Sequence, residues 1–153
     1  MRNAKLRAAT IGLGLGLAMA LQPAFADPGD KPGKPCSVAT LKGTYGLQMQ
    51  GTRPSSPGGP IETVIGVVVR TYDGEGSFTQ VDNVKGSMSG IVPDRPGAGT
   101  YEVNPDCSGV IHFEPAPGVF IEERIVIVDH GHEVRSITAA PPPIMVTAVF
   151  KKM

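Results

Sequence analysis

The stretch IETVIGVVVRTYDGEGSFTQVDN, residues 61–83, predicts two antiparallel strands joined by a tight turn. Residues 61–72 are rich in β-branched side chains, which favour strands, and Gly66 allows a bend or a bulge. The segment DGEG, residues 73–76, supplies two glycines for the unusual dihedral angles of a hairpin turn, and residues 77–83 return as the second strand. The rest of the fold is predicted by extending this hairpin in both directions.

Short alternating segments continue on both sides of the hairpin. In LKGTYGLQM, residues 41–49, the larger apolar side chains share one face, which is typical of a half-buried strand. No window shows a helical period over ten residues, and the segments 51–60 and 93–99 are rich in Gly and Pro, which predicts a loop and a turn. Further strands are predicted at residues 84–92, 100–104, 109–114, 119–128, 133–139 and 144–151. The pattern predicts an all-β fold, an antiparallel up-and-down barrel of about eight strands, with a β-sandwich as the alternative.

Residues 1–26 have the pattern of a secretory signal peptide. A basic start precedes an uncharged apolar stretch, which ends in the small residues that a signal peptidase cleaves after Ala26; a retained N-terminal anchor is the alternative. No lipobox precedes Cys36, so a lipid anchor is not expected. We therefore expect export to the periplasm or the cell exterior, with residues 27–35 as a flexible leader and 36–153 as a single barrel domain.

The charge balance argues against nucleic acid as a partner. The chain has 14 basic and 14 acidic residues, and loss of Arg2, Lys5 and Arg7 with the signal peptide leaves 11 against 14. The mature chain is then mildly acidic and has no block of Lys and Arg that would bind phosphates. No later apolar run has the length of a membrane span, so we expect a soluble protein after export.

The chain has two cysteines, Cys36 and Cys107, and we expect them to form a disulfide. An even count in an exported chain favours this pairing. A metal site would need more thiols or histidines at finger-like spacing, and the sequence has neither.

Four motifs along the chain resemble those of a known family. They are Cys36 before LKGTYGL, the turn YDGEGSF, the hairpin GTYEVNPDCSG at residues 99–109, and the late strand pair IVIVDHGHEVRSI. In this order they resemble a family of small exported, uncharacterised bacterial proteins. The resemblance implies a compact calycin-like or allene-oxide-cyclase-like barrel, and it brings no activity and no catalytic residues. His130 and His132 depart from the family pattern at their turn.

The segment DHGHE, residues 129–133, is a candidate metal site. The imidazoles of His130 and His132 suit Zn or Cu, but a closed site needs three or four ligands from different elements, and the only other histidine is His112. A polar hairpin turn is the simpler interpretation, so we expect no metal.

Glu123 interrupts an otherwise apolar strand on its apolar face, which makes it a candidate catalytic acid or base. An inward carboxylate needs a cation, and Arg70 or Arg135 on neighbouring segments can supply one. The alternatives are a structural ion pair, or a bulge that returns the carboxylate to solvent.

Tyr45, Phe78, Tyr101 and Phe113 are candidates, together with the two arginines, for lining a ligand pocket; the alternative is that they fill the core. The sequence contains no phosphate-binding loop, dinucleotide fingerprint, zinc-protease motif or nucleophile elbow, and no cofactor is expected.

Three functions remain open at this point. The first is a binding protein for a small apolar or amphipathic ligand or for an envelope or surface partner. The second is a cofactor-free cyclase- or isomerase-like enzyme that uses Glu123, and the third is a structural protein with a filled core. A cavity lined by Tyr45, Tyr101 and Glu123 would favour the first two; between them, a paired and fully bonded Glu123 would favour binding, and an unpaired one would favour catalysis.

Overall fold

Residues 61–83 form the predicted hairpin. In the computed structural model, which describes residues 34–153, strand β2 (Ile61–Asp73) pairs antiparallel with β3 (Ser77–Gly86). The carboxylate of Asp73 fixes the turn because its Oδ1 accepts the backbone N–H groups of Glu75 at 2.7 Å and Ser77 at 3.0 Å. The remaining strands extend this unit by further hairpins.

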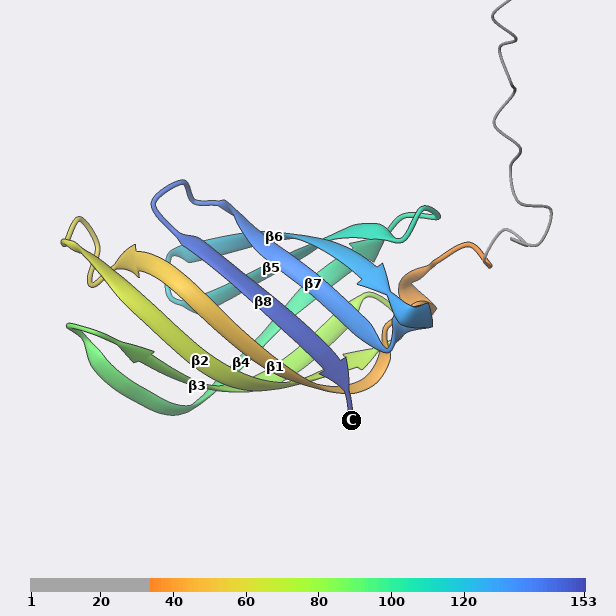
Figure 1. Ribbon diagram of the computed structural model, residues 1–153, viewed down its shortest axis with the longest axis horizontal. Coiled ribbons are helices and arrows are strands. Elements are labelled where there is room, and N and C mark those ends of the chain that lie inside the picture. The colour runs from red at the N-terminus through yellow and green to blue at the C-terminus, as the bar shows by residue number, and fades with distance from the viewer. Residues whose placement is uncertain (1–33) are drawn as a thin grey trace, which may run out of the picture. The chain divides into compact units, whose positions relative to one another are not determined.

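Eight antiparallel strands close into an up-and-down barrel, which confirms the predicted fold class (Figure 1). Each strand pairs with its neighbour in the chain, and β8 closes the barrel by pairing with β1. The other strands are β1 (Lys42–Pro54), β4 (Gly90–Val103), β5 (Ser108–Ala116), β6 (Val119–Val128), β7 (Glu133–Ala140) and β8 (Met145–Lys152), and the short 3-10 helices are η1 (Val38–Thr40) and η2 (Asp129–Gly131).

The predicted strand 84–92 and the predicted turn 93–99 are both wrong. The chain turns earlier, at residues 87–89, and β4 then runs through the proline-rich segment without a break. Gly90 adopts a φ of +78° that favours glycine, and a bulge at Asp94 allows β4 to pass its prolines.

Pro93 and Pro96 are tolerated because this part of β4 is an edge. Gly90–Ala98 pairs with β3 only, whereas pairing with β5 is confined to Gly99–Val103. A proline lacks the N–H that a central strand must donate, so it is accommodated where one side of the strand is unpaired. We call the side of Gly90–Ala98 that faces β5 the seam.

The two ends of the barrel differ. One end, which we call the plugged end, carries η1, η2 and the β2–β3, β4–β5 and β6–β7 turns (Figure 1). The opposite end, the rim, carries the tips of the β1–β2, β3–β4, β5–β6 and β7–β8 hairpins. Inward side chains near the plugged end are fully buried and form one apolar core that includes Leu41, Ile111 and Phe150.

Two tyrosines hold the plugged end together. The Tyr101 hydroxyl donates to the backbone carbonyls of Val38 and Leu41, and the Tyr45 hydroxyl donates to that of Gly131. The ring of Tyr72 packs between them, with centroids 5.4 Å from Tyr45 and 4.9 Å from Tyr101. Burial raises the pKa of Tyr72 to about 12.

The predicted disulfide between Cys36 and Cys107 is confirmed. It joins the segment before η1 to the β4–β5 turn at the plugged end, and the Cys36 N–H also bonds the carbonyl of Pro105. The predicted signal peptide and all but the last two residues of the predicted leader lie outside the described residues. Residues 34–153 contain no helix long and apolar enough to cross a membrane.

Candidate functional site

A cluster of polar side chains occupies the barrel interior on strands that otherwise point apolar groups inward. Because alternate residues of a strand face the same side, Arg70 shares the inward face of β2 with Val68 and Tyr72. The buried polar members of the interior are Glu62, Arg70, Gln80, Asp82, Glu123 and Ser136.

Arg70 lies at the centre of this cluster. Its Nε donates to Gln80 Oε1 at 2.8 Å, and its Nη1 donates to the Tyr72 hydroxyl at 3.3 Å. Its guanidinium also lies over aromatic rings, with Cζ at 4.3 Å from the ring centre of Phe78, 5.1 Å from Phe150 and 5.4 Å from Phe113. Burial by itself lowers the pKa of Arg70, but Tyr72 and Glu123 raise it above the ordinary value, so the interior holds a permanent cation.

Glu123 faces this cation but is not fully satisfied by it. Its Oε2 lies 3.5 Å from Arg70 Nη1, which makes an ion pair without a hydrogen bond. Within residues 34–153, this oxygen is the one buried side-chain nitrogen or oxygen atom that lacks a hydrogen-bond partner. A bulge does occur beside it, between β6 and β7, yet Glu123 remains inward and only 9% exposed.

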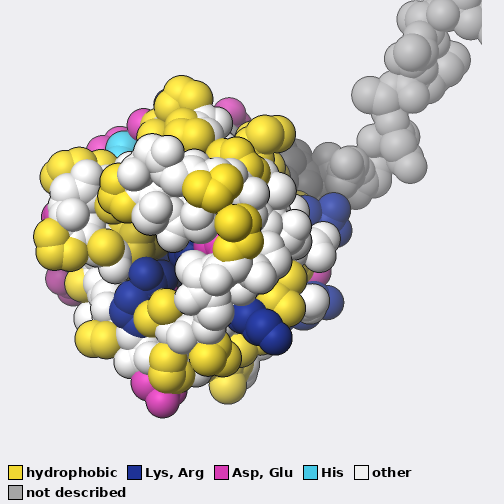
Figure 2. Space-filling view, turned by 90° about the vertical axis from the view of Figure 1, so that its left-hand side faces the viewer, with side chains coloured by type: hydrophobic (Ala, Val, Ile, Leu, Met, Phe, Trp, Pro, Cys, Tyr) yellow, Lys and Arg dark blue, Asp and Glu magenta, His cyan; other side chains and the backbone are white. Residues whose placement is uncertain are grey.

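The polar cluster extends from Arg70 towards solvent at the rim. Gln80 Nε2 donates to Asp82 Oδ2 at 3.2 Å, and Arg95 binds both oxygens of Asp82, at 3.0 and 3.1 Å. The Arg95 side chain is about one quarter exposed. Figure 2 looks onto the rim and shows charged atoms of both signs set back between hydrophobic side chains.

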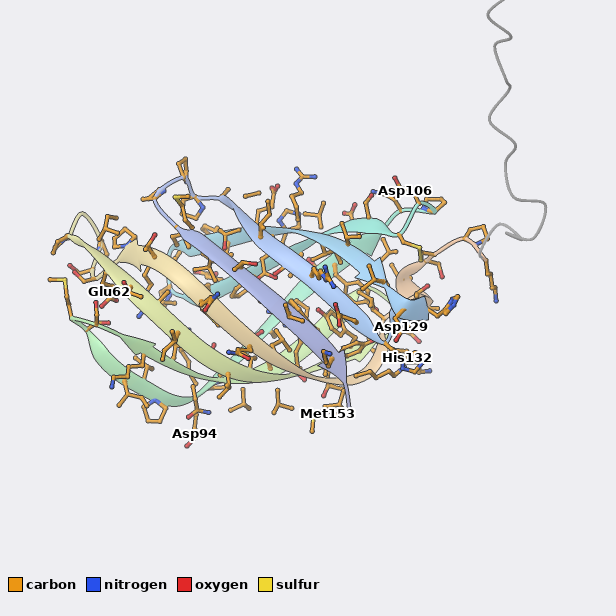
Figure 3. The ribbon with its side chains drawn as sticks, in the orientation of Figure 1. Glu62, Asp94, Asp106, Asp129, His132 and Met153 are labelled. Atoms are coloured by element: carbon orange, nitrogen blue, oxygen red, sulfur yellow. A yellow bond between two sulfur atoms is a disulfide. The ribbon has the colours of Figure 1, made fainter. Side chains whose placement is uncertain are left out.

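Glu62 is a second buried carboxylate, and sequence reasoning did not single it out (Figure 3). Its Oε2 accepts the backbone N–H groups of Met88 at 3.0 Å and Ser89 at 2.9 Å, and its Oε1 accepts Arg53 Nε and the Ser89 hydroxyl. These bonds lower the pKa of Glu62 to about 2, and the Ser89 bonds have the largest effect. A Cβ on Gly86 would lie within 2.4 Å of the carboxylate oxygens, so glycine makes room for this contact. Glu62 therefore holds the β3–β4 turn rather than offering a site.

The rim half of the interior has two kinds of wall. Strands β2, β3 and β4 contribute Arg70, Gln80, Asp82 and Arg95. Apart from Glu123 on β6, strands β1, β6, β7 and β8 contribute mainly apolar groups near the rim, and four inward residues there are only half-buried, namely Met49, Val119, Thr138 and Val146.

The structure separates the predicted site residues into three places. Arg70, Phe78 and Phe113 lie with Glu123 in the interior cluster, whereas Tyr45 and Tyr101 lie at the plugged end with their hydroxyls bonded to backbone. Arg135 corrects the prediction. It faces outward on β7, because it alternates with the inward Val134 and Ser136, and it pairs with Glu133 at 2.8 Å.

His130 and His132 lie at the plugged end in and beside η2. His130 is exposed with a φ of +54°, and residues 34–153 bring together no group of three His, Cys, Asp or Glu side chains that would hold a metal ion. The third histidine, His112, is exposed on β5 and faces away from the interior.

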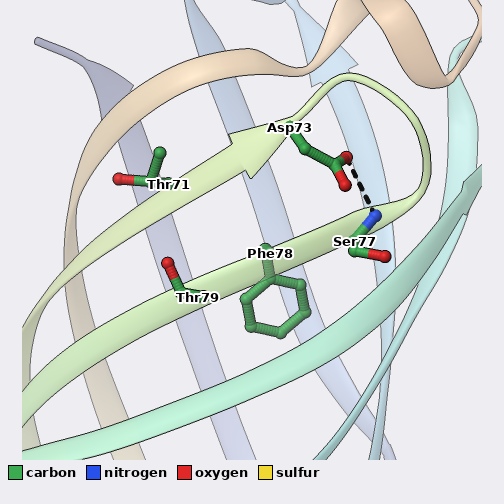
Figure 4. Close-up of a pocket in the computed structure, with 5 residues that line it drawn as sticks. All are labelled: Thr71, Asp73, Ser77, Phe78 and Thr79. Carbon is green, nitrogen blue, oxygen red and sulfur yellow. Dashed lines mark hydrogen bonds between the residues drawn. The ribbon is translucent and has the colours of Figure 1, made fainter.

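Two hollows lie on the outer surface rather than in the interior. One, of about 200 Å³, lies beside the β2–β3 turn and is lined by Thr71, Asp73, Ser77, Phe78 and Thr79 (Figure 4). The other, of about 580 Å³, is a groove over β2, β1, β8 and β7 with Ile65, Ile137 and Met145 among its walls. Both are open and lack buried polar groups that would orient a ligand.

Comparison of the chain with family models, curated proteins and solved structures found no match. The site is therefore interpreted from its own geometry.

Proposed function

We propose that the barrel is a binding protein for a small amphipathic molecule whose polar group donates a hydrogen bond to Glu123. The observation that carries this proposal is the unbonded Oε2 of Glu123, buried 3.5 Å from the guanidinium of Arg70. A buried carboxylate oxygen without a donor is costly, and a ligand hydroxyl or amine would supply the missing bond.

The surroundings of Glu123 support the amphipathic character of the ligand. The polar wall of β2–β4 leads from Arg70 to the partly exposed Arg95, and the facing wall is apolar and half-buried near the rim. A molecule with one polar end and a short apolar body would bury both parts.

Binding is proposed rather than catalysis because Glu123 is already paired with the guanidinium of Arg70, at 3.5 Å. Further along the cluster, Asp82 and Arg95 are bonded to each other. The proposal therefore includes no chemical step.

The test measures thermal stabilisation by three octyl probes: octylamine, which is a charged donor at neutral pH, 1-octanol, which is a neutral donor, and the donor-free octyl methyl ether. At ten times the dissociation constant, a bound probe stabilises by about 1.4 kcal/mol, which raises the melting temperature of a domain of this size by roughly 5 °C. We expect the amine and the alcohol to do so and the ether to have little effect.

The chain offers a matched control in the neighbouring residue. Glu123→Gln is expected to weaken octylamine binding at least tenfold, whereas Glu122→Gln, which removes a carboxylate bound to Arg124 on the outer side, leaves it unchanged. Equal losses in the two variants, or no shift with any probe and no small molecule in native mass spectra of protein from its own cells, would contradict the proposal.

We also propose that the protein is exported. The disulfide supports an oxidising compartment. The proposed resemblance to exported bacterial proteins points the same way. The intact mass of the mature protein tests cleavage after Ala26.

A further inference from the structure

We infer that the rim docks onto the surface of an uncharged lipid bilayer. The inference is independent of the proposed ligand, because it rests on the outer side chains of the hairpin tips.

Each of the four hairpin tips at the rim presents a large apolar side chain to solvent. Ile61 follows the β1–β2 loop and is 55% exposed, Met88 and Ile91 flank the β3–β4 turn at 60% and 66%, and Phe120 and Met145 follow the other two turns at 71% each. Figure 2 shows hydrophobic atoms around the whole of this end.

The outermost residues of the rim are uncharged, and the charged side chains of Arg53, Glu62 and Glu114 bond to the tips from the adjoining strands. The four tip segments, residues 55–61, 86–92, 115–121 and 139–145, contain no Asp, Glu, Lys, Arg or His. At the chain's average of 18% charged residues, four segments of seven residues would carry about five charges. The plugged end differs, since its turns carry the acids Asp106 and Asp129 (Figure 3).

This distribution fits a lipid surface better than a protein partner. A protein interface needs one continuous patch of matched shape, whereas the rim residues stand on four separate tips around charged groups. A bilayer accepts separate apolar anchors, each inserted a few ångströms below the headgroups. The absence of Lys and Arg from the tips selects a neutral surface, because anionic lipids are attracted by basic residues.

The test is flotation of the protein with vesicles of phosphatidylcholine, with and without added phosphatidylglycerol. We expect half of the protein to float at roughly 0.1–1 mM lipid, the range of a single acyl anchor, with no gain from the anionic lipid and no loss between 50 and 500 mM salt. Lack of flotation, or flotation only with anionic vesicles and low salt, would overturn the inference.

The variant pair separates the rim from the barrel wall. Phe120→Thr with Met145→Thr is expected to weaken flotation at least fivefold, whereas Val126→Thr with Ile137→Thr, on exposed wall positions of β6 and β7, leaves it unchanged. Equal loss of flotation in both variants contradicts the inference. A second measurement, sedimentation velocity, would also contradict it if the protein dimerises with rising concentration and the rim variant abolishes the dimer, because the rim would then be a contact between copies.

Discussion

The substitution Arg70→Met is expected to destabilise the barrel strongly because it leaves Glu123 buried without its cation. The two charges lie 3.5 Å apart with side chains that are 2% and 11% exposed. At an effective dielectric constant of about 20, Coulomb's law gives an attraction of about 5 kcal/mol. Removal of one partner from a buried pair typically costs about 3–5 kcal/mol, and we expect a loss in that range.

Two further variants separate the ion pair from the packing around it. Glu123→Gln is expected to cost only about 1–3 kcal/mol, because Arg70 keeps its bonds to Gln80 and Tyr72 and its aromatic neighbours. In the double variant the losses should not add, and the coupling free energy is expected to be about 2 kcal/mol or more.

The assay is urea unfolding followed by tyrosine fluorescence and far-ultraviolet circular dichroism, since the chain has three Tyr and no Trp. Arg135→Met is the matched control; it removes an exposed arginine that also pairs with a carboxylate, and it should cost less than about 1 kcal/mol. If Arg70→Met costs no more than this control, or if the losses of Arg70→Met and Glu123→Gln are additive, the ion pair does not stabilise the interior as argued. If Arg70→Met fails to fold, folding of the double variant would still show that the two residues are coupled, because removal of the Glu123 charge would have rescued the fold.

Three other predictions concern stability. The double change Cys36→Ser and Cys107→Ser opens a loop of 71 residues, which should lower stability by about 4 kcal/mol and the melting temperature by roughly 15–20 °C in calorimetry; a shift below about 5 °C would contradict the loop-closure argument. The pKa of Glu62 is about 2 in the folded barrel, so its stabilisation is complete above about pH 4.5 and is lost as the pH falls towards 2. Glu62→Gln should flatten the urea midpoint over this interval, and an unchanged slope would refute the assignment. Because Tyr72 ionises near 12 when folded and near 10 when unfolded, the urea midpoint should fall above about pH 10, and a constant midpoint up to pH 11.5 would exclude this.

Alternation along the strands predicted much of the fold and part of the site. It placed Glu123 on an inward face, and Arg70 was one of two possible partners because both arginines lie on neighbouring predicted strands. The same signal was present for Glu62, which shares its parity with Val64 and Val68, but its partners could not be predicted. They lie 26 and 27 residues further along the chain, and they depend on the register of β2 with β3.

The error at residues 84–99 has a physical cause. Gly and Pro are the residues that most often mark turns, and here they lie within a strand whose outer edge is unpaired. Local sequence does not state whether a strand has one neighbour or two. That information comes from the closure of the whole barrel, so it was not accessible from residues 90–98 alone.

At the seam, a strand of the barrel can change in length with little effect on its neighbours. In a fully closed ring, an insertion in any strand shifts the register of two neighbours and turns inward side chains outward. Along Gly90–Ala98 an insertion disturbs only the ladder with β3, and the pairing of Gly99–Val103 with β5 is left in place. Gly90–Ala98 is therefore a stretch in which an added residue disturbs the pairing of one neighbouring strand instead of two, with the disulfide and the buried tyrosines at the far end undisturbed.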